Sequence, residues 1–119
     1  MKSILVVEDE ENISKLISDT LNLGGYTVEY AFDGEIAVKK IEEGNFNLII
    51  MDIMLPKLDG FEVMNKITKK DIPIIFLSAK NDVSTIVKGL SEGGQDYITK
   101  PFEPLELLAR IELRIKKEE

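Results

Sequence analysis

The sequence contains no cysteine and no histidine among its 119 residues. Without cysteine the chain can form no disulfide and can offer no thiolate to a metal ion. Without histidine it lacks the most frequent general base, the most frequent zinc ligand and any side chain that could carry a phosphohistidine. Enzymes and metal sites that are built on those two residues are therefore excluded.

Long apolar stretches and positive charge are also scarce. No run is apolar enough for a signal peptide or long enough to span a bilayer, so the expected location is the cytoplasm. Lysine and arginine number 15 against 22 acidic residues, which gives a net charge of −7. This balance disfavours binding of DNA or of an anionic membrane by the domain itself. We expect one domain, residues 1–119, with no output domain.

Short apolar runs alternate with helical patterns along the whole chain. Three of the runs, at 4–7, 48–51 and 74–77, are apolar on both alternating faces, as in parallel strands covered on both sides. Between the runs, apolar residues recur with the period of a helix. The alternation predicts an α/β three-layer sandwich with a flavodoxin-like (βα)5 fold and a parallel sheet of order 2-1-3-4-5. The other predicted strands are 28–31 and 97–98, and the helical stripes are Ile13, Leu16, Ile17 and Leu21; Val83, Ile86, Val87 and Leu90; and Leu108, Ile111 and Ile115.

One carboxylate stands inside an apolar stretch, where a lone charge is unfavourable. Asp52 ends the third predicted strand in the stretch LIIMDIMLP, and an unpaired buried carboxylate either destabilises the fold or stays protonated. Ligands of open α/β sheets bind at the carboxyl ends of the strands. In the predicted order the first strand neighbours the third, at the usual strand spacing of about 5 Å. Because the first strand ends in Glu8, Asp9 and Glu10, we expect acidic side chains to face Asp52.

Ser78 and Lys100 follow the fourth and fifth predicted strands and complete this rim of the sheet. Three close carboxylates do not all ionise without a cation between them, and donors that are all oxygen suit Mg²⁺. The ammonium group of Lys100 would help to keep Asp52 ionised, and the hydroxyl of Ser78 can donate to an incoming oxygen. A carboxylate nucleophile, a metal, a lysine and a hydroxyl together indicate phosphoryl transfer.

Taken singly, most of these residues also have an ordinary structural interpretation. The acids after the first strand can favour the N-terminus of the next helix. Lys100 can be a solvated lysine and Ser78 a capping hydroxyl. We expect Asp59-Gly60 to be only a turn and a helix cap. Asp52 is the hardest to explain in this way, because an acid at the end of an apolar strand rarely serves packing, and the shared placement of the other groups at strand ends favours a functional site.

The whole chain resembles the receiver domain of bacterial response regulators, the phosphoacceptor half of two-component signalling. The segments ILVVEDE, MDIMLPKLDG, FLSAK and DYITKPFEPLELLARI carry the resemblance. It implies a CheY-like fold, a cis Lys100-Pro101 bond, Mg²⁺ as cofactor, and a sensor histidine kinase as the source of the phosphoryl group. The protein would catalyse only its own phosphorylation and dephosphorylation, so we do not expect a conventional turnover enzyme. The site residues implied by the resemblance are Asp52 as phosphoacceptor; Asp9, Asp52 and the backbone carbonyl of Met54 as metal ligands, with Glu8 acting through water; Ser78 as the hydroxyl; Tyr97 as the switch aromatic; and Lys100 as the phosphate-binding lysine.

The C-terminal segment YITKPFEPLELLARI is most similar to receivers of the OmpR/PhoB type, which precede a winged-helix DNA-binding domain. This resemblance implies transcription regulation through an output domain. It also implies a homodimer, formed on phosphorylation through the fourth helix, fifth strand and fifth helix, with Asp96, Arg110 and Glu106 on the dimer face. Two alternatives remain open from the sequence: a stand-alone receiver, and a degenerate receiver that acts only as a protein-interaction module.

Overall fold

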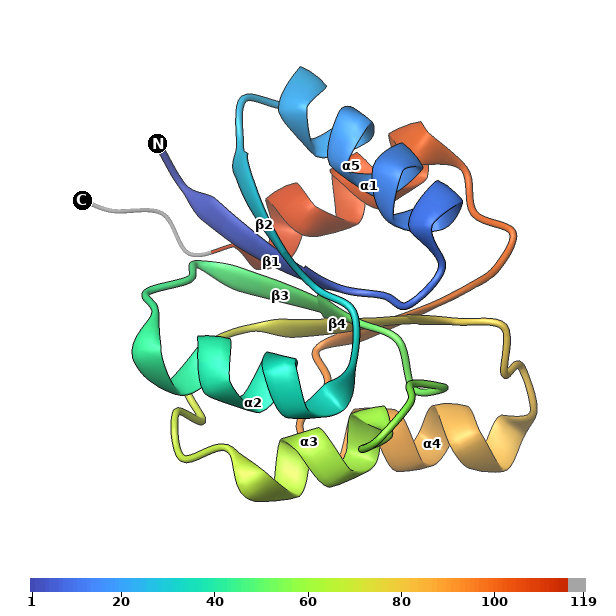
Figure 1. Cartoon of the computed structure of the whole chain (residues 1–119). Helices are drawn as coiled ribbons and strands as arrows, with labels where there is room; N and C mark the ends of the chain where they lie inside the picture. Colours follow the sequence, from blue (N-terminus) through green and yellow to red (C-terminus); the bar gives the residue numbers. More distant parts are fainter. Residues whose placement is uncertain (116–119) are drawn as a thin grey trace.

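The computed structural model describes residues 1–115, in which strands and helices alternate strictly (Figure 1). Each strand is followed by a helix that returns the chain to the start of the next strand. The elements are β1 (Ser3–Val7), α1 (Glu11–Leu23), β2 (Thr27–Ala31), α2 (Gly34–Glu43), β3 (Leu48–Met51), α3 (Gly60–Lys66), β4 (Ile74–Ser78), α4 (Val83–Ser91), β5 (Asp96–Thr99) and α5 (Pro104–Arg114).

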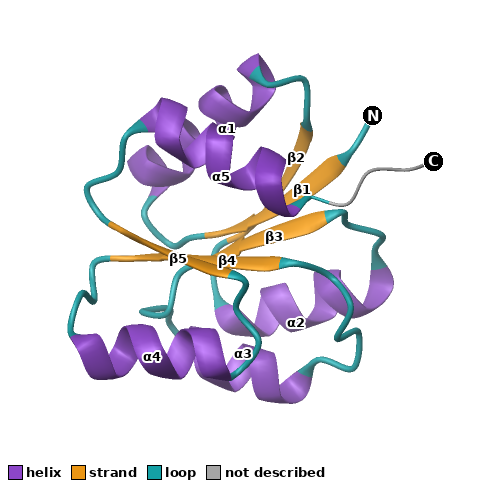
Figure 2. Ribbon diagram, turned by 180° about the vertical axis from the view of Figure 1, so that it is seen from behind, coloured by secondary structure: helices purple, strands orange, loops and turns teal. Residues whose placement is uncertain are grey.

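The five strands form one parallel sheet in the order β2-β1-β3-β4-β5, which confirms the predicted topology. Helices α1 and α5 cover one face, and α2, α3 and α4 cover the other (Figure 2). Alternate residues of β1 and β3 enter two separate apolar clusters, one on each side of the sheet. This is why the central strands are apolar at successive positions, and why polar groups collect only at the strand ends.

The predicted element boundaries are correct to within a few residues. The fourth strand includes Ser78, and the fifth runs from Asp96 to Thr99. Pro104 occupies the first turn of α5, as expected for a residue with no amide hydrogen to donate. Asp59 caps α3 by accepting a hydrogen bond from the Glu62 amide, while the Glu62 carboxylate accepts one from the Asp59 amide. The structural interpretation of Asp59-Gly60 is therefore confirmed.

The apolar stripe predicted for α4 does not face the core, and that prediction was wrong. Helix α4 instead turns Gly89 toward the sheet. A Cβ atom at this position would lie 3.1 Å from the Phe76 ring and 3.2 Å from the Tyr97 ring, so a larger residue would push the helix outward. The stripe consequently points to solvent. Its exposed members are Val83 (76%), Val87 (57%) and Leu90 (46%), while Ile86 is half-buried.

The stripes predicted for α1 and α5 are correct in part. In α1, Ile17 and Leu21 are fully buried, but Leu16 is 46% exposed. In α5, Ile111 is buried as expected, together with Leu107, which the predicted stripe omitted. Two neighbouring apolar residues in one helical turn can each be assigned to the buried face, and the apolar pattern alone did not show which of the two is buried. Within residues 1–115, no helix combines the length and the apolar character needed to cross a bilayer.

We expect the amides of α4 to exchange with solvent faster than those of α1. Helix α1 is anchored by the fully buried Ile17 and Leu21, whereas the buried residue of α4 is Gly89. Glycine also lowers helix stability by about 1 kcal/mol relative to alanine. Hydrogen exchange of the native protein, followed residue by residue with NMR, measures the difference. Equal protection of the two helices would contradict this expectation.

Candidate functional site

Four chain segments bring polar side chains to one edge of the sheet, at the carboxyl ends of the strands. Glu8 follows β1, Asp52 follows β3, Ser78 ends β4 and Lys100 follows β5. Glu8, Asp52 and Ser78 are almost completely buried, at 2%, 4% and 0% exposure. The strand order places these residues together although they are far apart in the sequence. The structure thus contains a buried polar cluster at the switch point of the sheet.

Lys100 holds the two buried carboxylates together. Its Nζ atom donates hydrogen bonds to Glu8 Oε1 at 2.7 Å and to Asp52 Oδ2 at 2.8 Å. The second carboxylate oxygens accept from the main chain, Asp52 Oδ1 from the Met54 amide and Glu8 Oε2 from the Glu10 amide, both at 3.1 Å. Each buried carboxylate therefore has two partners, which explains how Asp52 can stand within an apolar stretch.

The pKa values in the cluster reflect this competition between burial and pairing. Burial raises the pKa of the Glu8 carboxyl, and hydrogen bonds from Lys100 and the Glu10 amide lower it only in part. For Lys100, burial favours the neutral amine, but the hydrogen bonds to Asp52 and Glu8 outweigh it and raise the pKa above its usual value. Lys100 therefore carries a positive charge at neutral pH, beside the carboxylate of Asp52.

Asp9 joins the two buried acids to form a group of three carboxylates. Oxygen atoms of Glu8, Asp9 and Asp52 lie within 4.8 Å of one another, in agreement with the spacing expected from neighbouring strands. Asp9 is exposed, whereas Glu8 and Asp52 are buried. A donor set made only of oxygens fits a hard divalent cation, and the exposed side at Asp9 leaves room for the waters that Mg²⁺ retains. The residues present thus fit the expected magnesium site.

The main chain of Lys80 connects the predicted hydroxyl to the predicted switch aromatic. Ser78 Oγ accepts a hydrogen bond from the Lys80 amide at 3.3 Å, and the Tyr97 hydroxyl donates to the Lys80 carbonyl at 2.6 Å. The ring of Tyr97 packs 6.1 Å from that of Phe76, on the side of the sheet covered by α4. Sequence reasoning missed Lys80 because its role depends on backbone groups, which no side-chain pattern reveals.

The loop after β3 is held close to α3 by Gly60. Its amide donates to the carbonyl of Ile53 at 2.8 Å, and a Cβ atom on Gly60 would lie 2.6 Å from the carbonyl oxygen of Asp52. The start of α3 thus supports the backbone of the central carboxylate. Met54 contributes its amide to Asp52, while a metal-binding role for its carbonyl stays a prediction. The Lys100-Pro101 bond is cis, as the resemblance implied.

The three residues expected on a dimer face lie on β5 and α5 and contact one another within the chain. Arg110 forms ion pairs with Asp96 at 3.1 Å and with Glu106 at 2.9 Å. Arg114 also approaches Asp96, at 4.0 Å. The structure brings these charges together on one surface, separate from the carboxylate cluster.

Comparison with known proteins agrees with this geometry. The family model of the response regulator receiver domain matches residues 4–112. The chain belongs to the response-regulator receiver family. The predicted family is therefore confirmed, and receiver domains of this family bind Mg²⁺ at an acidic pocket and work with histidine kinases.

Two relatives of this receiver domain are named as transcriptional regulators. It is 47% identical over 116 residues to the transcriptional regulatory protein DltR of Streptococcus agalactiae, covering 96% of this chain and 52% of that protein. It is 45% identical to the alkaline phosphatase synthesis transcriptional regulatory protein PhoP of Bacillus subtilis, covering 99% of this chain and 50% of the relative. The chain thus spans about half the length of these curated relatives.

A solved structure shows the same fold. The non-phosphorylated HemR receiver domain of Leptospira biflexa superposes with a TM-score of 0.90 at 30% identity, covering 100% of this chain and 98% of that one. The described fold, including the strand order that creates the site, is that of a receiver domain.

We expect Lys100→Met to destabilise the protein by roughly 3 kcal/mol, because the change leaves two buried carboxylates without their counter-charge. The Lys100 side chain is only 11% exposed, so water replaces the lost ammonium poorly. Urea unfolding at neutral pH in the presence of EDTA measures the loss. Lys39→Met, at an exposed position of α2, serves as the matched control. Equal urea midpoints for the two variants would show that Lys100 does not hold the cluster together.

Proposed function

We propose that this receiver domain accepts a phosphoryl group on Asp52 from the phosphohistidine of a sensor kinase and thereby controls an output domain that regulates transcription. The main support is the buried Asp52 carboxylate, which Lys100 contacts at 2.8 Å beside two further acids. The names of the curated relatives support the regulatory role. Those relatives extend well beyond the region that matches, which is where an output domain would lie.

The proposed reaction is a direct transfer between two side chains. One carboxylate oxygen of Asp52 forms a bond to phosphorus while the bond between phosphorus and the donor's imidazole nitrogen breaks, and that nitrogen keeps the electron pair. Because this chain has no histidine, the phosphohistidine lies outside it; when a small acyl phosphate is the donor, the bond from phosphorus to the acyl oxygen breaks instead and the carboxylate leaves with the electron pair. Lys100 places a positive charge 2.8 Å from Asp52 Oδ2, and the Ser78 hydroxyl donates to a phosphoryl oxygen. The protein acts on itself and is not a turnover enzyme.

Asp9, Asp52 and the main-chain carbonyl of Met54 would hold Mg²⁺, with Glu8 acting through water. When bound, Mg²⁺ supplies positive charge that offsets the charge of the phosphoryl oxygens. Glu8 is already engaged by Lys100 and is 2% exposed, whereas Asp9 faces solvent. We therefore rank Asp9 above Glu8 as a direct ligand.

The signal would leave the site through Ser78 and Lys80. If Ser78 Oγ turns toward a phosphoryl oxygen, the hydrogen bond that it accepts from the Lys80 amide is weakened and the loop after β4 is free to shift. The carbonyl of Lys80 accepts a hydrogen bond from the Tyr97 hydroxyl, so a movement of Lys80 releases the Tyr97 ring. Because that ring packs beside Gly89, the surface of α4, β5 and α5 would change shape.

Asp52→Asn should abolish uptake of phosphate while leaving the fold intact, because the amide has nearly the same shape but is not a nucleophile. Wild type incubated with Mg²⁺ and acetyl phosphate should gain the mass of one phosphoryl group, detected by intact-protein mass spectrometry, and should fail to do so with EDTA. Asp59→Asn, an acid in the cap of α3, is the matched control. Unchanged uptake in Asp52→Asn would rule out Asp52 as the acceptor, and no uptake in wild type would favour a degenerate receiver.

We further propose that phosphorylation produces a two-fold dimer through α4, β5 and α5. In such a dimer Asp96 and Arg110 would pair across the interface twice, because both protomers use the same surface. Arg110 already binds Asp96 and Glu106 within one chain, so the intermolecular pairs replace existing ones, and each adds at most about 1 kcal/mol. The exposed Val87 and Leu90 of α4 can contribute apolar contact to the same surface.

Arg110→Ala should weaken the dimer roughly 3- to 30-fold, since two exposed ion pairs are each worth up to about 1 kcal/mol. Analytical ultracentrifugation with and without beryllofluoride, a phosphoryl mimic, measures the dissociation constant. Lys39→Ala on α2 should leave it unchanged. A wild-type protein that stays monomeric at high concentration with beryllofluoride bound would argue for a stand-alone receiver.

A further inference from the structure

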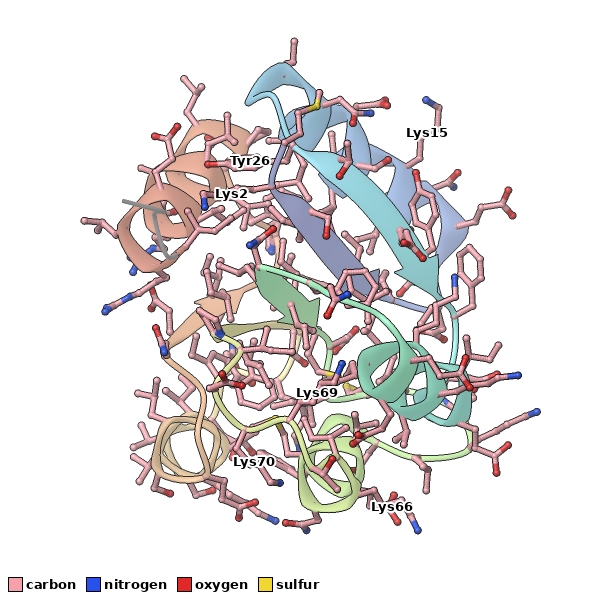
Figure 3. All side chains as sticks on the ribbon, turned by 90° about the vertical axis from the view of Figure 1, so that its left-hand side faces the viewer. Lys2, Lys15, Tyr26, Lys66, Lys69 and Lys70 are labelled. Carbon is pink, nitrogen blue, oxygen red and sulfur yellow. The ribbon has the colours of Figure 1, made fainter. Side chains whose placement is uncertain are left out.

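The Lys88 side chain connects α4 to α3. The two helices lie side by side on one face of the sheet (Figure 3). Lys88 precedes Gly89, the residue that α4 turns toward the sheet, and its Nζ atom lies 4.3 Å from the centroid of the Phe61 ring. A cation within about 6 Å of an aromatic centroid is attracted by the partial negative charge of the ring face. Lys88 and Phe61 thus form a cation–π contact between two helices, away from the acidic cluster.

This contact is unusual among the polar contacts of α4. The hydroxyl groups in the first turn of the helix donate to its cap, Asp82, and the hydroxyl of its last residue donates to the Lys88 carbonyl. Lys88 also approaches Glu92, one turn further along, at 4.0 Å. All of these contacts lie within α4 and its caps, so they move with the helix. Within residues 1–115, the contact with Phe61 is the polar link from an α4 side chain to another helix.

The Phe61 end of the contact is fixed. Gly60, the preceding residue, donates its amide hydrogen to the Ile53 carbonyl at 2.8 Å, and the capping box holds the first turn of α3. The Phe61 ring is half-buried and packs 5.8 Å from the fully buried Phe76 ring. One end of the contact is therefore attached to the segment that carries Asp52, and the other end is attached to the loosely packed α4.

A movement of α4 relative to α3 would change this contact. The attraction requires the ammonium group to lie over the ring at short distance, so a shift of α4 away from α3 would remove it. A contact that is present in one conformation and absent in another stabilises the first conformation relative to the second. A ligand that binds the second conformation better must then overcome the energy of that contact.

We propose that the contact between Lys88 and Phe61 stabilises the unphosphorylated position of α4 and is lost when Asp52 is phosphorylated. This inference rests on the proposed function, because it requires that phosphorylation moves α4. Lys88 is a positioning residue: it does not touch the acceptor, and it affects Asp52 only through the equilibrium between two positions of α4. Without the contact the second position is more populated, so a phosphoryl mimic binds more tightly.

Binding of beryllofluoride in the presence of Mg²⁺, followed by NMR of the isotope-labelled full chain, tests the proposal. Lys88→Met keeps the length of the side chain but removes its charge. Because the Lys88 side chain is 54% exposed, losing the contact should raise the affinity for beryllofluoride only about two- to fivefold. Lys88→Arg keeps a cation over the ring and should bind as wild type does. Lys66→Met, which removes a lysine of α3 that extends away from α4 in Figure 3, should also leave the affinity unchanged.

Further variants show whether Phe61 is the partner that matters. In a Phe61→Leu background the ring is absent, so Lys88→Met should cause no additional gain in affinity. Glu92→Gln removes the other partner of Lys88 and should bind as wild type does. The same gain from Lys88→Met with and without the Phe61 ring, or an equal gain from Glu92→Gln, would assign the effect to another contact and overturn the proposal.

The result for wild type separates this inference from the proposed function. Wild type that binds no beryllofluoride would overturn the proposed function and this inference with it. Wild type that binds beryllofluoride as tightly as Lys88→Met, or more tightly, would overturn this inference alone. Each variant should retain the far-UV circular dichroism of wild type, and Lys88→Arg should restore the wild-type affinity, which general damage to α4 would not explain.

Discussion

The site depends on one ammonium group shared by two buried carboxylates. Lys100 contacts Glu8 and Asp52 at 2.7 and 2.8 Å, and without it the two acids would repel each other in a nearly dry environment. This contact joins the ends of β1, β3 and β5, which the order β2-β1-β3-β4-β5 brings to one edge of the sheet. The Lys100 ammonium group thus links the ends of three strands, and the fold concentrates its polar groups where the central strands stop being covered by helices.

The backbone around Asp52 is as constrained as its side chain. The amide of Met54 binds Asp52 Oδ1, and Gly60 brings α3 so close that a Cβ atom would lie 2.6 Å from the Asp52 carbonyl. The capping box of Asp59 and Glu62 fixes the first turn of that helix. A turn with an ordinary structural role therefore positions the proposed phosphoacceptor, because the Gly60 amide at the start of α3 donates to the carbonyl of Ile53, the residue after Asp52. Fixed positions of this kind are what phosphoryl transfer requires of a protein that supplies little covalent chemistry.

The sequence predicted the sheet and the convergence of Glu8, Asp52, Ser78 and Lys100, because both follow from strand order and from the rule that ligands bind at strand ends. It did not predict which side of α4 faces the sheet. Periodicity shows where apolar residues recur along a helix. It does not show that a glycine lets the helix approach aromatic rings closely, as Gly89 does at Phe76. It also could not assign Lys80, whose amide and carbonyl act independently of its side chain. Glu8 is buried and Asp9 is exposed because Glu8 is the acid that reaches Lys100. A sequence does not show which of two adjacent acids will do so.

The loose packing of α4 has a consequence for signalling. Displacing α1 would expose Ile17 and Leu21, at roughly 1.5–3 kcal/mol for each buried side chain. Displacing α4 separates Gly89 from Phe76 and Tyr97, while Val83, Val87 and Leu90 are already 76%, 57% and 46% exposed before any movement. A phosphoryl group on the proposed acceptor Asp52 would supply only a few new hydrogen bonds, so it would most readily move an element that is held weakly. The Tyr97 hydroxyl binds Lys80 in the loop that enters α4, which places this helix next to the segment that the phosphoryl site would move. The exposed apolar residues of α4 are therefore suited to a surface whose shape changes without disturbing the core.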